Sequence, residues 1–167
     1  MQLPDGYTAD SQAAFALMKT RPRLSIDDLK VLALLESAAE QFYFGLAQQM
    51  TNAEARALLT RNGQEELGHA HRLVKAIRLL GGETFELPGA AENPFLQTPA
   101  PSVAVTPDFL ELFALGEADG DLQYHAWADA EPNAEVAKIY RQNGVEETRH
   151  GERLTQVRAM LLAQPGG

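Results

Sequence analysis

Residues 64–73 read QEELGHAHRL, and residues 145–154 read VEETRHGERL. Each stretch contains Glu-Glu-x-x-His followed by Arg-Leu at the same offset, and the two lie 81 positions apart. Random placement of the four histidines among the glutamates would give only about 0.4 copies of Glu-x-x-His. Two copies, each preceded by a second Glu, therefore indicate a chemical role. The alternative is a surface Glu–His pair, three residues apart on a helix, that a duplication preserved.

The repeat extends well beyond this motif. When residues 36–73 are compared with residues 117–154, 13 of 38 positions are identical, which is more than unrelated helices of similar composition would share. The matched positions include Glu36 with Glu117, Tyr43 with Tyr124, Asn62 with Asn143, Gly63 with Gly144 and Arg72 with Arg153. The two segments are interpreted as copies of one ancestral unit.

Four segments carry apolar residues at the three- and four-residue steps of an amphipathic helix. They open at residues that suit helix N-termini, namely Ser25, Thr51-Asn52, Pro107 and Asn133. Only a few residues join the first segment to the second and the third to the fourth. We therefore predict an all-α chain, an antiparallel four-helix bundle made of two repeated helical hairpins, residues 25–81 and 107–163.

Residues 82–106 contain four prolines and no clean periodicity. A connection of about 25 residues is long for a compact domain, so it is interpreted as a crossover that runs the length of the bundle. The alternative is a disordered linker between independent hairpins, which is disfavoured because a lone hairpin cannot bury its apolar face. Residues 1–24 form an N-terminal segment in which we predict a short helix near Asp10–Lys19.

Composition excludes several classes of protein. The chain has no cysteine, which rules out disulfides, zinc ribbons and cysteine-held iron–sulfur clusters and fits a reducing compartment such as the cytoplasm. The net charge of −9 argues against nucleic acid and anionic membranes as partners. That charge reflects either solubility or carboxylates that bind metal. No apolar run approaches the ~18 residues of a membrane span, and no secretory signal is visible.

Helical geometry brings six of the repeated side chains to one level. Residues three apart share a helix face, so Glu66 and His69 point the same way, as do Glu147 and His150. Glu36 and Glu66 lie at equal sequence distances from the turn of the first hairpin, as Glu117 and Glu147 do from the turn of the second. Glu36 and Glu117 also continue the apolar stripes of their helices. Carboxylates on a core-facing stripe are costly unless they are paired or bind metal. Glu40 and Asp121, one turn farther along, are the alternative ligands, but their midpoints with Glu66 and Glu147 fall slightly off the turns.

This pattern resembles the ferritin-like di-iron carboxylate superfamily over residues 25–163, and most closely rubrerythrin-type and bacterioferritin-type proteins. The resemblance implies a ferritin-like fold, two iron ions (or manganese or zinc) and a homodimer or higher homo-oligomer. It assigns Glu36 and Glu117 as terminal ligands, Glu66 and Glu147 as bridging ligands, and His69 and His150 as one imidazole ligand for each metal. Four carboxylates would balance the charge of two divalent ions.

Side chains next to these ligands have secondary roles in the prediction. Ligating histidines usually donate their second N–H to a carboxylate, so we predict that Glu65 accepts from His150 and Glu146 from His69; two exposed glutamates are the alternative. Tyr43 and Tyr124 lie on the ligand face and either bond near the site, act as local reductants, or pack in the core. Glycines at 63, 120 and 144 indicate close packing or space for a small substrate, since glycine costs about 1 kcal/mol within a helix.

The implied function is a di-iron oxidoreductase, peroxidase or ferroxidase-like, that reacts with peroxide or dioxygen. Rubrerythrins carry a further Glu three residues after the third-helix ligand, where this chain has Gly120. They also usually carry a rubredoxin domain; without cysteine this chain has none, so an external electron donor is expected. Two alternatives remain, an iron-storage protein of the ferritin type and an interaction bundle with a vestigial metal site.

Overall fold

Helices account for the regular structure of this chain. The computed structural model describes residues 1–81, 84–97 and 103–163, which contain five α-helices, one short 3₁₀ turn and no strand. The all-α prediction is therefore confirmed. The elements are α1 (Ser11–Lys19), α2 (Ile26–Gln48), α3 (Ala53–Gly81), η1 (Pro94–Leu96), α4 (Pro107–Ala130) and α5 (Ala134–Leu162).

Side-chain caps explain where the helices begin. Ser25 and Asp28 form a reciprocal capping box at the start of α2. Asn133 accepts hydrogen bonds from two backbone N–H groups at the start of α5, and Pro107 occupies the first turn of α4. Each cap satisfies backbone donors that a helix leaves without an internal partner. The helix starts therefore follow the predicted positions, and α1 occupies the predicted N-terminal helix.

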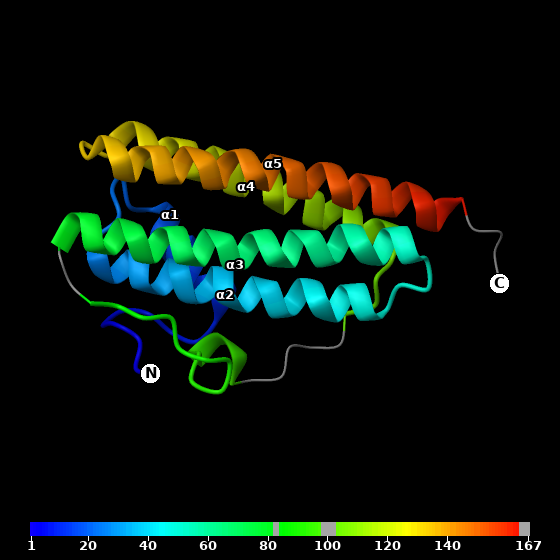
Figure 1. Cartoon of the computed structure of the whole chain (residues 1–167), viewed down its shortest axis with the longest axis horizontal. Helices are drawn as coiled ribbons and strands as arrows, with labels where there is room; N and C mark the ends of the chain where they lie inside the picture. Colours follow the sequence, from blue (N-terminus) through cyan, green and yellow to red (C-terminus); the bar gives the residue numbers. More distant parts are fainter. Residues whose placement is uncertain (82–83, 98–102, 164–167) are drawn as a thin grey trace.

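The four long helices lie side by side along the longest axis of the molecule (Figure 1). α2 runs antiparallel to α3, α4 runs antiparallel to α5, and α3 packs along α5 (Figure 1). α1 lies behind them, where Phe15 makes an edge contact with Trp127 of α4 at a ring-centroid distance of 6.4 Å. No helix among the described residues is long and apolar enough to cross a membrane.

The described part of the connection between α3 and α4, residues 84–97, lies beside α2 (Figure 1). Asn93 is fully buried, and its Nδ2 donates to the carbonyl oxygen of Leu34 over 2.9 Å. η1 follows directly and packs on α2. The described part of the predicted crossover is thus anchored to the helices; residues 82–83 and 98–102 of that prediction lie outside the described residues.

The core is divided into two apolar clusters with a polar layer between them. One cluster includes Leu32 of α2, Leu73 of α3 and Trp127 of α4. The other includes Leu59 of α3 and Leu154 of α5. Between the two clusters lie the buried side chains of Glu36, Glu66, His69, Glu117, Glu147 and His150. Apolar packing on both sides therefore holds an ionisable layer away from water.

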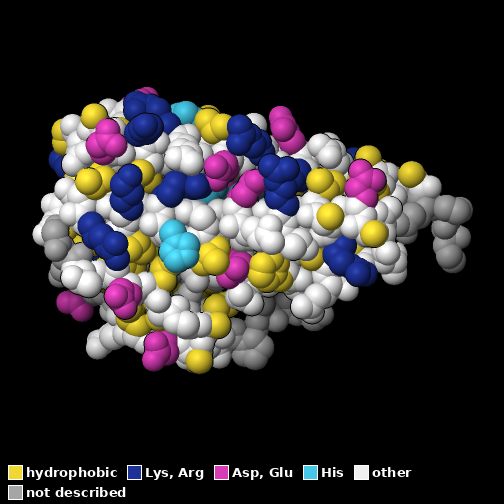
Figure 2. All heavy atoms as spheres, in the orientation of Figure 1, with side chains coloured by type: hydrophobic (Ala, Val, Ile, Leu, Met, Phe, Trp, Pro, Cys, Tyr) yellow, Lys and Arg dark blue, Asp and Glu magenta, His cyan; other side chains and the backbone are white. Residues whose placement is uncertain are grey.

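Charged side chains of both signs are scattered over the face that Figure 2 shows. On the face that α3 and α5 form in Figure 2, Lys and Arg side chains are interspersed with Asp and Glu. The excess of negative charge in the whole chain is therefore not gathered on this face.

Two repeated glycines allow close approach of neighbouring helices. A Cβ at Gly63 would lie 2.9 Å from the Phe44 ring and 3.0 Å from the carbonyl oxygen of Glu40 in α2. A Cβ at Gly144 would lie 2.8 Å from Asp121 Oδ1 and 3.3 Å from the Asp121 carbonyl oxygen in α4. Of the two roles predicted for glycine, these two positions serve packing within each hairpin.

Gly63→Ala should lower the free energy of unfolding relative to Gly45→Ala, because a Cβ at Gly45 meets nothing within 4 Å. Both changes share the helix-propensity gain of alanine over glycine. Their difference therefore isolates the packing cost, roughly 1–3 kcal/mol. Urea denaturation of both variants measures it. Equal stability of the two variants would contradict the packing role of Gly63.

Candidate metal centre

Six buried residues from α2, α3, α4 and α5 meet in the polar layer, and none of these residues is more than 7% exposed. Their ligand atoms form two sets, each lying within 4.8 Å of one another. One set contains Glu36, Glu66, His69 and Glu147, and the other contains Glu66, Glu117, Glu147 and His150. Glu66 and Glu147 belong to both sets. Such buried Glu and His groups could hold a metal ion.

One ring nitrogen of each histidine faces the carboxylates. Nδ1 of His69 lies 3.2 Å from Glu147 Oε1 and 3.4 Å from Glu66 Oε2. Nδ1 of His150 lies 3.1 Å from Glu147 Oε2 and 3.2 Å from Glu66 Oε1. The two rings are stacked, with centroids 5.3 Å apart. Nδ1 of each histidine therefore lies within 3.4 Å of an oxygen of Glu66 and of an oxygen of Glu147.

Glu36 and Glu117 occupy the outer positions. Glu36 Oε2 lies 3.7 Å from Nδ1 of His69, and Glu117 Oε2 lies 3.7 Å from Nδ1 of His150. Each of these carboxylates is a member of only one of the two sets. The sequence spacing predicted that Glu36 and Glu117 lie level with Glu66 and Glu147, and the structure brings these residues together. Their role as terminal ligands is what the family resemblance implies.

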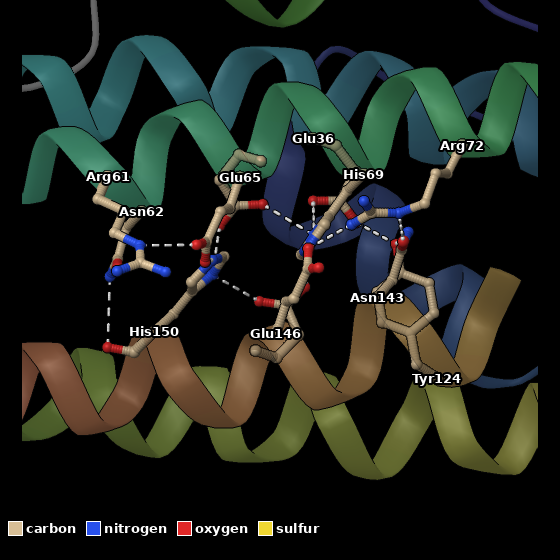
Figure 3. A network of polar contacts seen from close by, with 12 residues as sticks. Glu36, Arg61, Asn62, Glu65, His69, Arg72, Tyr124, Asn143, Glu146 and His150 are labelled. Atoms are coloured by element: carbon tan, nitrogen blue, oxygen red, sulfur yellow. Dashed lines mark hydrogen bonds and ion pairs between the residues drawn. The ribbon is translucent and has the colours of Figure 1, made fainter.

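The second ring nitrogen of each histidine faces a carboxylate of the opposite hairpin (Figure 3). Nε2 of His69 lies 3.1 Å from Glu146 Oε2, and Nε2 of His150 lies 3.2 Å from Glu65 Oε2. These are the two pairings that the sequence predicted. Hydrogen bonds lower the pKa of both glutamates despite partial burial, so both are ionised and can only accept. The proton at each contact therefore resides on Nε2, which leaves Nδ1 to face the six-residue cluster.

An arginine and an asparagine support each of these glutamates, a feature that sequence reasoning missed. Nη1 of Arg153 donates to Glu65 Oε2 over 2.7 Å and to Asn62 Oδ1 over 2.8 Å. In the other half, Arg72 pairs with Glu146 and donates through Nε to Asn143 Oδ1 over 2.6 Å (Figure 3). The sequence did contain a signal for this role, because Arg72 matches Arg153 and Asn62 matches Asn143 at a shift of 81 positions.

Tyrosines cross between the hairpins to the outer carboxylates. The hydroxyl of Tyr43 in α2 donates to Glu117 Oε1 over 2.5 Å, and that of Tyr124 in α4 donates to Glu36. Burial, followed by the neighbouring carboxylates, raises the pKa of both tyrosines well above the usual value. Both hydroxyls are therefore donors at neutral pH. Of the roles predicted for these tyrosines, the observed geometry corresponds to hydrogen bonding at the site.

The carboxylates also determine the protonation of the histidines. Burial by itself lowers a histidine pKa, but the charge of Glu147 and the surrounding carboxylates outweigh burial and raise the pKa of His69 well above its ordinary value. Burial also lowers the pKa of His150, but hydrogen bonds that its ring donates to the surrounding carboxylates outweigh burial and raise this pKa well above its ordinary value. Burial raises the pKa of Glu117. Without metal, protons therefore offset part of the clustered negative charge.

Two buried atoms within the cluster have no hydrogen-bond partner, Glu66 Oε2 and His69 Nδ1. Buried polar atoms are usually satisfied, so an unsatisfied pair calls for an explanation. Carboxylate oxygens and imidazole nitrogens are suitable donors for iron, manganese and zinc. The donor set is therefore suited to a metal ion, and both unsatisfied atoms belong to residues of the first ligand set.

The alternative ligands lie outside both sets. Glu40 accepts from the neighbouring Gln41 side chain, and Asp121 accepts from Thr148 Oγ1 over 2.7 Å and lies 3.1 Å from Nε2 of His125. His71 is exposed. The structure thus separates these side chains from the six that it brings together.

Comparison of the chain with protein-family models, curated proteins and solved structures found no match.

In metal-free protein, the free energy of unfolding should fall as the pH rises above the ordinary histidine pKa of about 6.5. The raised pKa values mean that folded His69 and His150 keep protons that the unfolded chain releases. The limiting slope is about 1.4 kcal/mol per pH unit for each retained proton. Urea denaturation at a series of pH values measures it. His69→Gln with His150→Gln should remove the slope, and His71→Gln with His125→Gln should retain it; the reverse pattern would contradict this assignment.

Proposed function

We propose that this chain is a ferritin-like di-metal protein, an oxidoreductase that uses two iron ions to reduce peroxide or dioxygen. The single observation that supports this proposal is the overlap of two ligand sets through Glu66 and Glu147. Two carboxylates common to both sets suit a pair of neighbouring cations better than a single ion. In this proposal the two hairpins are repeats of one unit, and together they form a four-helix bundle with a crossover.

Each metal position would have its own outer ligands. Glu36 and His69 would hold one ion, Glu117 and His150 would hold the other, and Glu66 and Glu147 would bridge them. Four carboxylates neutralise two divalent cations, which favours binding in a dry layer. When bound, two iron(II) ions supply the two electrons needed to reduce a peroxide.

The remaining side chains of the layer hold the ligands in place. Glu65 and Glu146 accept from Nε2 of the histidines and so keep Nδ1 directed inward. Arg153 and Arg72 position those two glutamates in turn. Tyr43 and Tyr124 donate to the outer carboxylates, which leaves the other oxygen of each carboxylate available for metal. The apolar clusters above and below limit access by bulk water.

Electrons must come from outside the chain. With no cysteine, this chain carries neither an iron–sulfur centre nor a thiol pair that could deliver them. The proposed reaction therefore requires a separate electron donor after each oxidation of the metal pair.

Glu66→Gln combined with Glu147→Gln should abolish binding of the metal pair, because both ions lose their shared ligands. Glu40→Gln combined with Asp121→Asn removes the same number of carboxylates outside the ligand sets and should leave two metals per chain. Metal analysis of purified protein loaded with iron(II) under anaerobic conditions measures both. Two metals in the first variant, or their loss only in the second, would contradict the ligand assignment.

Iron(II)-loaded protein should be oxidised by hydrogen peroxide, as followed by ferric absorbance in the near ultraviolet, and should be restored by an added reductant over repeated cycles. Tyr43→Phe with Tyr124→Phe should retain metal but slow the oxidation, because the outer carboxylates lose their orienting donors. Accumulation of many irons per chain in a large shell, without reductant-dependent turnover, would instead indicate storage. Absence of any oxidation with two irons bound would contradict the proposed activity.

A further inference from the structure

A cavity of about 430 Å³ lies between α1, α2 and α4 and ends at the metal-ligand cluster. Its outer lining consists of exposed residues, among them Ser11 and Gln12 of α1 and Gly116 of α4. Its inner lining includes the buried carboxylates Glu36 and Glu117, together with both shared glutamates. The cavity therefore joins the surface to the layer in which the metal ligands meet.

The walls between the mouth and the floor are apolar. Phe15 of α1, Leu32 and Leu35 of α2 and Phe113 of α4 line the cavity. The charged side chain at the mouth, Asp119, is paired with Lys19 of α1. A cavity of this volume with apolar walls and a few polar groups at one end is typical of a site for a small organic molecule.

Two glycines of α4 line the cavity where α2 has larger residues at the shift of 81 positions. Gly116 and Gly120 in α4 correspond to Leu35 and Ala39 in α2 at the shift of 81 residues, and all four line the cavity. A Cβ at Gly116 would meet nothing within 4 Å, so this position is open. A Cβ at Gly120 would lie 3.6 Å from Glu147 Cγ, at ordinary contact distance. Unlike Gly63 and Gly144, these two glycines are not required by helix packing.

We propose that this cavity is the substrate pocket of the centre and that it takes an organic hydroperoxide, an uncharged apolar group bearing an O–O–H end. The proposal rests on the proposed function, because it names the oxidant that the metal pair would reduce. The apolar walls fit an uncharged organic group. Hydrogen peroxide or dioxygen alone would not need apolar walls of this extent.

The reaction balances with the components already named. Cleavage of the O–O bond of the hydroperoxide would require two electrons, and two bound iron(II) ions would supply one each and become iron(III). Two protons from solvent complete the products, an alcohol and water. The external electron donor then returns two electrons.

Binding is tested without any turnover by 2-phenyl-2-propanol, the unreactive alcohol that corresponds to cumene hydroperoxide. The full chain, loaded with zinc, is titrated with this alcohol and followed by NMR. Wild-type protein should bind the alcohol.

Gly116→Leu is the decisive variant, because leucine already occupies the equivalent position, Leu35, in α2. It should weaken alcohol binding at least tenfold. Gly45→Leu is the matched control, since Gly45 is also an exposed helical glycine whose Cβ would meet nothing within 4 Å; it should change binding less than twofold. The fluorescence of Trp127, the sole tryptophan, reports whether the contact with Phe15 and hence the docking of α1 is intact.

Iron-loaded protein supplies an independent arm. In Gly116→Leu the oxidation rate with cumene hydroperoxide, relative to the rate with hydrogen peroxide, should fall at least tenfold, and in Gly45→Leu it should not change. If Gly116→Leu lowered the oxidation rates with both oxidants equally, or bound the alcohol as tightly as wild type, the assignment of this cavity as the substrate pocket would be wrong. No alcohol binding by protein that holds two zinc ions would overturn it and leave the proposed function standing. Alcohol binding by protein that fails to bind a metal pair would overturn the proposed function and the reduction step but support the pocket.

Discussion

Four carboxylates buried at one level of a helical protein repel one another, and each loses its hydration. Glu36, Glu66, Glu117 and Glu147 can remain there only if positive charge is supplied. In metal-free protein that charge comes from protons, which is why the pKa values of His69 and His150 are raised in spite of burial. Two divalent cations would supply the same compensation without those protons. The polar layer is therefore stable only when bound protons or cations neutralise its negative charge.

The same requirement explains how the two hairpins are joined. Polar contacts at the centre run mainly from one hairpin to the other: Tyr43 to Glu117, Tyr124 to Glu36, and each histidine to a glutamate of the opposite hairpin. Asn62 Nδ2 also donates to the carbonyl oxygen of His150. The apolar clusters on either side contribute the burial that stabilises the pairing. Packing of the hairpins and assembly of the candidate site are thus one event.

Much of this could be predicted from the sequence because the signals are local or repeated. Caps such as Ser25 and Asn133 mark helix starts, and helical periodicity places Glu66 and His69 on one face. The choice of Glu36 over Glu40 followed from distances to the turn, and the structure brings Glu36 into the cluster. The partners of Tyr43 and Arg153 could not be derived, because they depend on interaxial distances and rotations between hairpins. The division of the glycines also required coordinates, since Gly63 and Gly120 look alike in a helical pattern and differ only in what a Cβ would meet.

The ligands follow the repeat, but the surroundings of the site do not. On the side of α3 and α5, Glu65 with Arg153 and Glu146 with Arg72 close the layer through paired charges. On the side of α2 and α4, Gly116 and Gly120 occupy the positions that correspond to Leu35 and Ala39. Among the described residues between α3 and α4, no α-helix precedes α4 as α1 precedes α2. If the two hairpins are copies of one unit, the difference between the two faces arose after the duplication. It removes side chains at the positions that separate the carboxylates from the surface, which is the expected direction of change if one face of a symmetric centre became its access route.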